Sequence, residues 1–239
     1  MKRLKRWLKA ARKLGPYKLA RRLLWFATKA CLIFGLICGL WVSAYRFINP
    51  PITYLMVTEW WRLGELNREW LDLDEISPHL ARSVLAAEDA NFCDHWGFDF
   101  EEIQKALDET HRKRGASTIT QQAAKNVFLW PDASWTRKGL EAGFAILITL
   151  FWPKDRTLEI YLNVAEFGPG VFGAEAGAAR GFKNAAADLK LTQSARLAAV
   201  LPNPRERHPQ RISANRAAHI ADGAETLRAD GRADCLGIE

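Results

Sequence analysis

The stretch Glu88-Asp89-Ala90-Asn91-Phe92-Cys93-Asp94-His95-Trp96-Gly97 says the most about the fold and the site of this chain. Two adjacent carboxylates stand close to a phenylalanine, a histidine and a turn glycine, a combination that suits the entrance of an active site. Apolar residues precede Glu88 and predict a helix that ends at this carboxyl, and an apolar flank raises the pKa of a carboxyl group. Glu88 is therefore a candidate base, although the same pair could be a solvated cap at a helix end.

A second motif is Gly115-Ala116-Ser117-Thr118-Ile119-Thr120-Gln121-Gln122. Small and hydroxyl-bearing residues before a helix present backbone N–H groups and hydroxyls to an anion. Thr118 and Gln121 also have the spacing of a capping box, which needs no ligand, and the two roles can coexist. Lys125 shares a helical face with Gln121, so we predict that Lys125 contacts a phosphate group.

Two further motifs are Arg137-Lys138-Gly139-Leu140-Glu141 and Lys154-Asp155-Arg156-Thr157-Leu158-Glu159-Ile160-Tyr161-Leu162-Asn163. The first could be an ordinary i, i+4 ion pair on a helix, worth about 0.3–0.5 kcal/mol. It could also supply cations to a binding site. The second motif is predicted to be mostly structural, with Lys154 at a turn and Tyr161 in the core.

Basic charge is concentrated at the N-terminus. Of the 34 Lys and Arg residues, 12 lie at or before Arg46, and no Asp or Glu precedes Glu59. The remainder carries 22 basic against 27 acidic residues, so a mildly acidic body follows a basic arm. A nucleic-acid-binding domain would carry its basic residues on a folded surface, and we therefore expect no nucleic-acid partner.

The segment Leu23–Tyr45 is apolar or neutral except for Lys29, and it is long enough to span the hydrocarbon core of a membrane. The basic arm and the aromatic residues near both ends predict a single-pass helix with a cytoplasmic N-terminus. The alternative is a cleaved signal peptide, which usually has a shorter basic leader and a small-x-small cleavage site. The aromatic stripe between Pro51 and Asp74 fits either a helix packed on the domain or one lying at the membrane surface.

The rest of the chain predicts a mainly α fold with few strand signals. Expected helices are Pro78–Glu88, Phe98–Arg112, a turn and helix over Gly115–Phe128, Trp135–Phe151, Leu158–Val164, Phe172–Arg180 and Arg196–Leu201. One further helix, beyond Pro209, is weakly indicated by His219, Ile220 and Leu227.

The four motifs, in this order, resemble those of the peptidoglycan glycosyltransferases (glycosyltransferase family 51), from about Pro51 to about Pro209. The resemblance implies a lysozyme-like helical glycosyltransferase domain with a small lobe near the membrane. It also implies inverting transfer from an undecaprenyl-diphosphate-linked glycan to the GlcNAc 4-hydroxyl of lipid II. The expected segments are a cytoplasmic arm (1–22), a transmembrane helix (23–45), a membrane-proximal connector (46–76), the glycosyltransferase domain (77–209) and a C-terminal tail (210–239).

In this interpretation Glu88 is the catalytic base, and Glu141 is the second catalytic carboxylate, on the leaving-group side. The residues expected to bind substrate are Asp89, Phe92, His95, Ser117, Thr118, Gln121, Gln122, Lys125, Asn126, Arg137 and Lys138. The resemblance implies no required cofactor but allows a divalent cation, magnesium or manganese, at the diphosphate. The implied partners are lipid II, the growing glycan chain, membrane lipid and other proteins of cell-wall synthesis, at the periplasmic face of the inner membrane.

Two other functions are consistent with parts of the sequence. A lysozyme-like lytic enzyme would cleave the same glycan, but it needs a general acid and has no use for a cationic diphosphate site. A membrane-anchored scaffold would need no catalytic residues. No Ser-x-x-Lys motif is present, which excludes a transpeptidase of that type. Gln193 stands where the family usually has a glutamate, and we expect this change to affect a helix start more than the chemistry.

Cysteine placement suggests one disulfide. Cys31 and Cys38 lie inside the predicted span, whereas Cys93 and Cys235 lie in the part predicted to be outside, where the compartment is oxidising. These two could pair and brace the Glu88 loop, or they could remain free thiols. No cysteine and histidine spacing typical of a structural zinc site is present.

Overall fold

The computed structural model describes residues 16–108 and 117–238, and the chain divides into two compact units, 1–44 and 45–239. Residues 1–15 of the basic arm, and Gly115 and Ala116 of the expected anion loop, lie outside the described residues. The first unit is built on α2 (Pro16–Tyr45), which begins earlier than the predicted span. Within the described ranges, α2 is the one helix that is long and apolar enough to cross a membrane.

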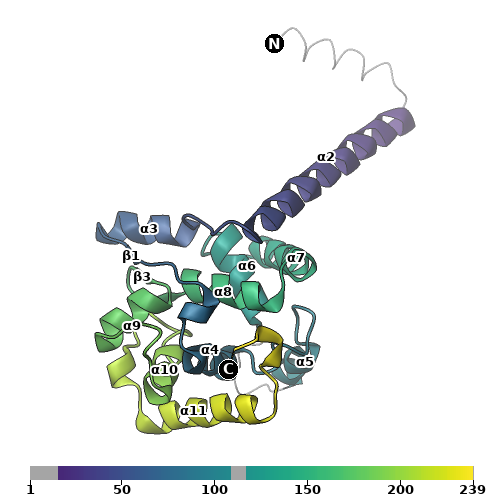
Figure 1. The fold of residues 1–239 in the computed structure, drawn as a ribbon. Coiled ribbons are helices and arrows are strands. Elements are labelled where there is room, and N and C mark those ends of the chain that lie inside the picture. The colour runs from purple at the N-terminus through teal and green to yellow at the C-terminus, as the bar shows by residue number, and fades with distance from the viewer. Residues whose placement is uncertain (1–15, 109–116, 239) are drawn as a thin grey trace. The chain divides into compact units, whose positions relative to one another are not determined.

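The second unit is mainly α, which confirms the predicted fold class (Figure 1). Its α-helices are α3 (Tyr54–Leu63), α4 (Pro78–Glu88), α5 (Phe100–Asp108), α6 (Ile119–Phe128), α7 (Trp135–Phe151), α8 (Lys154–Val164), α9 (Ala174–Phe182), α10 (Leu191–Ala198) and α11 (Ala214–Ala229). Short 3-10 turns are η1 (Leu73–Glu75), η2 (Pro209–Arg211) and η3 (Asp234–Leu236).

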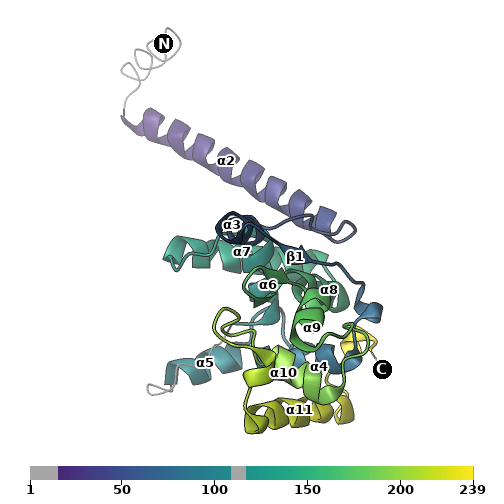
Figure 2. The ribbon, with the colours of Figure 1, turned by 90° about the vertical axis from the view of Figure 1, so that its left-hand side faces the viewer.

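The helices of this unit form two packed groups. Helix α4 packs against α10 and α11, while α6 packs against α7 and α8. Figures 1 and 2 show α4, α10 and α11 together on one side of the unit and α6, α7 and α8 on the other. Fully buried side chains of α4 (Leu80, Leu85) and α8 (Leu158, Leu162) belong to the core. Two of the candidate site helices, α4 and α6, therefore come from different groups.

A small sheet, which the sequence did not predict, lies among these helices. Strands β1 (Asn67–Arg68), β2 (Glu166–Gly168) and β3 (Val171–Phe172) are arranged in the order β1-β3-β2, with β1 parallel and β2 antiparallel to β3. Strands this short contain too few residues to show an alternating pattern. Gly173 follows β3 with φ +89°, and a Cβ there would lie 3.2 Å from Asn163 O, so the position suits glycine.

The weakly indicated C-terminal helix is a full element of the fold. Helix α11 buries Ala217, Ile220, Ala224 and Leu227. Its packing on α4 is close, because a Cβ added at Gly223 would lie 3.1 Å from the Cβ of Ala86. The tail therefore covers the helix that carries Glu88.

Several predicted boundaries differ from the observed ones. Helix α10 begins at Leu191 rather than Arg196, and α9 is displaced by two residues from the predicted Phe172–Arg180. The early start of α10 has a local cause, since the side chain of Gln193 accepts a 3.0 Å hydrogen bond from Lys190 N. A glutamine closes this capping contact as a glutamate would. The predicted segment Phe98–Arg112 is helical from Phe100 to Asp108, and its last residues lie outside the described ranges.

Candidate active site

Glu88, the last residue of α4, is held at one of its two carboxylate oxygens. Gln122 Nε2, on α6, donates a 2.8 Å hydrogen bond to Glu88 Oε2. Glu88 Oε1 is buried and accepts no hydrogen bond from any residue that the structure describes. Burial raises the pKa of Glu88, against the opposing effects of the Gln122 hydrogen bond and of three cations, Lys125, Arg216 and Arg207. A desolvated carboxylate with one unpaired oxygen is suited to accept a proton.

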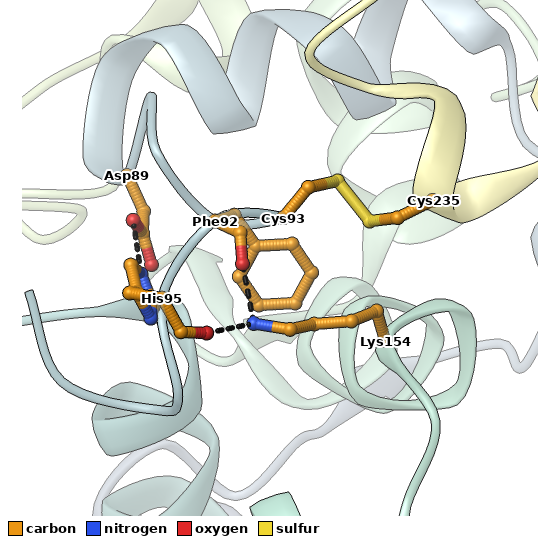
Figure 3. Close-up of a disulfide and its surroundings, with 6 residues drawn as sticks. All are labelled: Asp89, Phe92, Cys93, His95, Lys154 and Cys235. Carbon is orange, nitrogen blue, oxygen red and sulfur yellow. Dashed lines mark hydrogen bonds and ion pairs between the residues drawn. A yellow bond between two sulfur atoms is a disulfide. The ribbon is translucent and has the colours of Figure 1, made fainter.

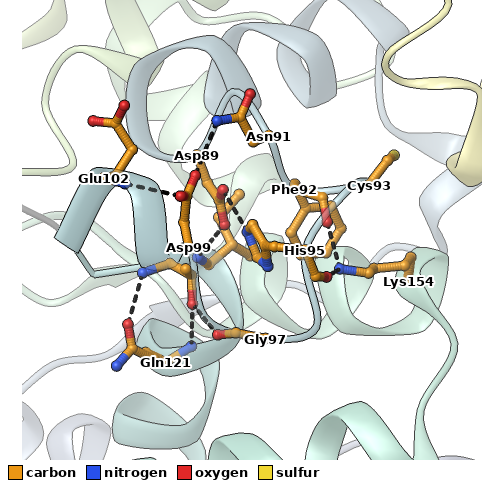
Figure 4. A network of polar contacts seen from close by, with 12 residues as sticks. Asp89, Asn91, Phe92, Cys93, His95, Gly97, Asp99, Glu102, Gln121 and Lys154 are labelled. Carbon is orange, nitrogen blue, oxygen red and sulfur yellow. Dashed lines mark hydrogen bonds and ion pairs between the residues drawn. The ribbon is translucent and has the colours of Figure 1, made fainter. Parts of the chain in front are cut away.

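Asp89 connects the end of α4 to the start of α6. Its Oδ1 lies 2.8 Å from His95 Nε2, and its Oδ2 accepts a 2.8 Å hydrogen bond from Ile119 N. Asp89 is 7% exposed, and both of its oxygens are occupied by these contacts (Figure 4). In the structure Asp89 and His95 hold the loop that follows Glu88, and their expected contact with substrate stays a prediction.

The loop after Asp89 is also fastened to α8 and to the C-terminus (Figure 3). Lys154 Nζ donates to Phe92 O and, at 2.7 Å, to His95 O, and it lies 4.4 Å from the centre of the Phe92 ring. Burial lowers the pKa of Lys154. A disulfide joins Cys93 to Cys235, with their Cα atoms 5.8 Å apart. Phe92 is 1% exposed, so its side chain packs in the core, and its expected contact with substrate stays a prediction.

Thr118 and Gln121 form the predicted capping box at the start of α6. The Thr118 hydroxyl accepts a hydrogen bond from Gln121 N, donates to Gly97 O at 2.7 Å, and is buried with the Gln121 side chain. Gly97 has φ +76°, and a Cβ there would clash with Thr149 Oγ1. These contacts give Thr118 and Gln121 a structural role. Their expected contact with substrate stays a prediction beside this role.

A cavity of about 390 Å³ lies beside Gln122. Its polar and charged lining residues are Gln122, Lys125, Asn126, Asp132, Arg137, Tyr161, Glu166 and Arg205. Burial lowers the pKa of Lys125, while the charge of Glu141 opposes this effect. The sequence identified the first three residues and Arg137, but it did not identify Arg205 and Glu166, whose closest charged atoms are 3.6 Å apart. The cavity thus brings two half-buried cations, Lys125 and Arg137, next to the amide that holds Glu88.

Glu141 has a different environment from Glu88. It is 3% exposed, and its two oxygens are paired with Arg137 Nη1, at 2.5 Å, and with Lys138 Nζ. Lys138 Nζ also lies 3.3 Å from Ser117 Oγ, so Ser117 is connected to the same group. Both cations are positioned by one carboxylate.

The described residues provide little support for a tightly held metal ion at Glu141. No group of three or more His, Cys, Asp or Glu side chains in the described ranges is placed to hold a metal. Both oxygens of Glu141 already face cations, so a divalent ion would have to displace Arg137 or Lys138. Glu141 in this arrangement therefore does not fit the role of a metal ligand.

Comparison with known proteins identifies the family. A family model described as Transglycosylase matches residues 56–225. The chain belongs to the transglycosylase family. It is 53% identical over 205 residues to the biosynthetic peptidoglycan transglycosylase of Jannaschia sp. (strain CCS1), covering 84% of this chain and 85% of the relative. The proteins of the same name from Caulobacter vibrioides and Xanthomonas campestris pv. campestris (strain B100) are 51% and 50% identical, covering 82% and 90% of this chain and 88% and 93% of the relatives.

Within this transglycosylase, the expected site residues fall into two groups. Glu88, Gln122, Lys125, Asn126 and Arg137 meet at or next to the cavity. Contacts of Asp89, His95, Thr118 and Gln121 fasten the loop that follows Glu88 and the start of α6, and Phe92 packs in the core. The sequence interpretation assigned Tyr161 to the core, and it did not show that Tyr161 also borders the cavity.

Proposed function

We propose that this chain is a peptidoglycan glycosyltransferase that polymerises lipid II into glycan strands. One arrangement supports the proposal most: a desolvated carboxylate with an unpaired oxygen, Glu88, is held by an amide that lines a cavity with half-buried cations, Lys125 and Arg137. A lytic enzyme would need a general acid but no cationic cavity. The names of the relatives agree with the synthetic activity.

In the proposed reaction, Glu88 acts as the general base. Its Oε1 accepts the proton of the GlcNAc 4-hydroxyl of lipid II as that oxygen attacks the anomeric carbon of the growing glycan. The new C–O bond forms while the bond from this carbon to the diphosphate breaks, and undecaprenyl diphosphate leaves with the electron pair. Attack opposite to the leaving group inverts the configuration at the anomeric carbon.

The cavity cations are proposed to hold the leaving diphosphate. Lys125 and Arg137 line the cavity, and fixed positive groups stabilise negative charge as it develops in a site that excludes water. Because burial disfavours the charged form of Lys125, a bound diphosphate would favour its protonation. Glu141 keeps Arg137 and Lys138 in place before the substrate arrives.

The same proposal places the catalytic unit at the periplasmic surface of the inner membrane. Helix α2 has the length and composition of an anchor. In the second unit, α3 exposes Tyr54, Trp60 and Trp61, the last of which is 81% exposed. Aromatic side chains of this kind bind the interfacial region of a bilayer, which is also where a lipid-linked substrate lies. Other proteins of cell-wall synthesis are the remaining proposed partners.

The test is incubation of the full chain, in detergent or in vesicles, with labelled lipid II. Polymeric glycan from the wild type, and none from Glu88→Gln, is the expected result. Cleavage of preformed glycan instead would support the lytic function, and the absence of both reactions would support a scaffold. Lys105→Ala is a matched control for cation variants, because Lys105 is exposed on α5 and pairs with Glu102.

A further inference from the structure

We propose that Tyr161 is a positioning residue for the catalytic base, acting through Gln122 on Glu88. This inference rests on the proposed function, in which Glu88 takes the proton of the acceptor hydroxyl. Tyr161 belongs to a motif that the sequence presents as structural, and it never has to touch the substrate to act in this way.

The three side chains form a continuous hydrogen-bonded chain across three helices. The Tyr161 hydroxyl, from α8, donates to Gln122 Oε1 at 3.0 Å, and Gln122 Nε2, from α6, donates to Glu88 Oε2 at 2.8 Å. Tyr161 is 1% exposed. The hydroxyl is therefore held by the core, and the carboxylate at the other end lies at the site.

The groups at the two ends of this hydrogen-bonded series, a phenol and a carboxylate, determine which atom donates and which accepts at each step. An ionised carboxylate only accepts hydrogen bonds, so the Gln122 nitrogen must face Glu88 and its oxygen must face Tyr161. Burial raises the pKa of Tyr161 far above its usual value, with further contributions from the charges of Glu88 and Asp89. The hydroxyl therefore stays protonated and remains a donor. Successive donors pointing toward one acceptor strengthen each other.

The hydrogen bonds from Tyr161 through Gln122 determine which oxygen of Glu88 stays unpaired. Oε2 is occupied by Gln122, whereas Oε1 is buried and unpaired among the described residues, which makes Oε1 the proposed proton acceptor. Without the Tyr161 hydroxyl, Gln122 Oε1 loses this donor, and the amide is held less firmly. Its hydrogen bond to Glu88 Oε2 then weakens, and the carboxylate loses part of its fixed position.

The acidic limb of the pH–rate profile reports on this loss. The charged groups that influence Glu88 are Lys125 on α6, Arg207 after α10 and Arg216 on α11, with Asp89 next to it in the chain. All of them remain when only the Tyr161 hydroxyl is removed. The hydrogen bond from Gln122 favours the ionised form, so its weakening raises the pKa of Glu88 and moves the acidic limb to higher pH.

The test is Tyr161→Phe in the full chain, assayed with labelled lipid II over a range of pH. We expect kcat to fall about tenfold, because the change weakens the hydrogen bond from Gln122 to the charged Glu88 carboxylate. We also expect the acidic limb to move upward by roughly half to one pH unit, with KM nearly unchanged. Tyr17→Phe is the matched control, because Tyr17 is 76% exposed at the start of α2.

A second variant separates positioning from folding. Gln122→Met has a similar length but makes neither hydrogen bond, and it should reproduce the shift of the acidic limb. The double variant Tyr161→Phe, Gln122→Met should have a turnover little lower than that of Gln122→Met alone, because both changes break the same series of hydrogen bonds. An unshifted acidic limb in Gln122→Met, or additive losses in the double variant, would overturn the proposal. If Glu88→Gln itself remains active, the proposed function fails instead.

Discussion

Two carboxylates of the candidate site, Glu88 and Glu141, have different surroundings. Glu88 ends α4 with one oxygen bonded to a neutral amide and the other unpaired among the described residues. Glu141 lies within α7 with each oxygen paired with a cation. Both carboxylates are largely withdrawn from solvent, but only Glu141 forms direct ion pairs, whereas the cations near Glu88 act on it from a distance.

This difference supports the proposed roles. A desolvated carboxylate without an ion pair holds a proton more readily, which is what a base near neutral pH requires. A carboxylate between two cations holds them in a fixed geometry. The proposed proton acceptor and the proposed support for cations are therefore the same residue type in different surroundings.

The sharpest test of this comparison is Glu88→Gln. The amide preserves the shape of the side chain but cannot accept a proton, so polymerisation should fall by at least ~10²-fold. Thermal stability should be unchanged or higher, because a desolvated charge is removed. Turnover of labelled lipid II and the unfolding midpoint are the measurements, and turnover within a few-fold of the wild type would exclude Glu88 as the base.

A comparison of Lys125→Ala with Lys154→Ala distinguishes the contribution of the cavity to turnover from that of the loop after Asp89. We expect Lys125→Ala to reduce turnover by about 10²-fold with little change in stability, because it removes a cation from the leaving-group cavity. Lys154→Ala should reduce turnover less and stability more, because Lys154 holds the carbonyl oxygens of Phe92 and His95. Equal effects on turnover, measured beside Lys105→Ala, would contradict the placement of one of these lysines.

Glu141→Gln should behave differently from Glu88→Gln. It leaves the mostly buried Arg137 without its partner, and breaking a buried ion pair costs on the order of 3 kcal/mol. Turnover should fall about tenfold, since the cations lose their fixed position. The unfolding midpoint and turnover should thus decrease together. Loss of turnover alone, with full stability, would mean that Glu141 acts directly in the chemistry.

The disulfide fastens the loop that follows Glu88, because Cys93 lies in that loop. Closing a loop between Cys93 and Cys235, 142 residues apart, stabilises the fold by on the order of 4–5 kcal/mol in the chain-entropy model. Cys235→Ser should lower the unfolding midpoint, while turnover at low temperature stays within a few-fold of the wild type. Mass mapping of non-reduced peptides checks the bond directly, and two separately alkylated cysteines would contradict it.

The smallest effect is expected from α3, which touches neither carboxylate. Replacing Trp60 and Trp61 by Ser should raise the apparent KM for lipid II in vesicles a few-fold and leave kcat unchanged, because both side chains are exposed. The same variant in detergent is the control. An equal effect in detergent would mean that these tryptophans act on folding rather than on the membrane.

Local spacing accounts for what the sequence predicted well. The capping box of Thr118 and Gln121 and the ion pair of Arg137 and Glu141 join residues three and four positions apart. Helix geometry alone brings such residues together. The small sheet and the start of α10 were missed, since strands of two or three residues leave no periodic signal.

The sequence by itself determined the class of fold, the family and the identity of the two carboxylates, because these follow from motifs in a fixed order and from helical periodicity. Only the tertiary structure decided that Glu141 forms ion pairs and that Glu88 keeps one oxygen without a hydrogen-bond partner among the described residues. Tyr161 lies 39 residues from Gln122, and Gln122 lies 34 residues from Glu88. Contacts over such separations depend on how whole helices pack, and the partners and burial that set a pKa are fixed at that level.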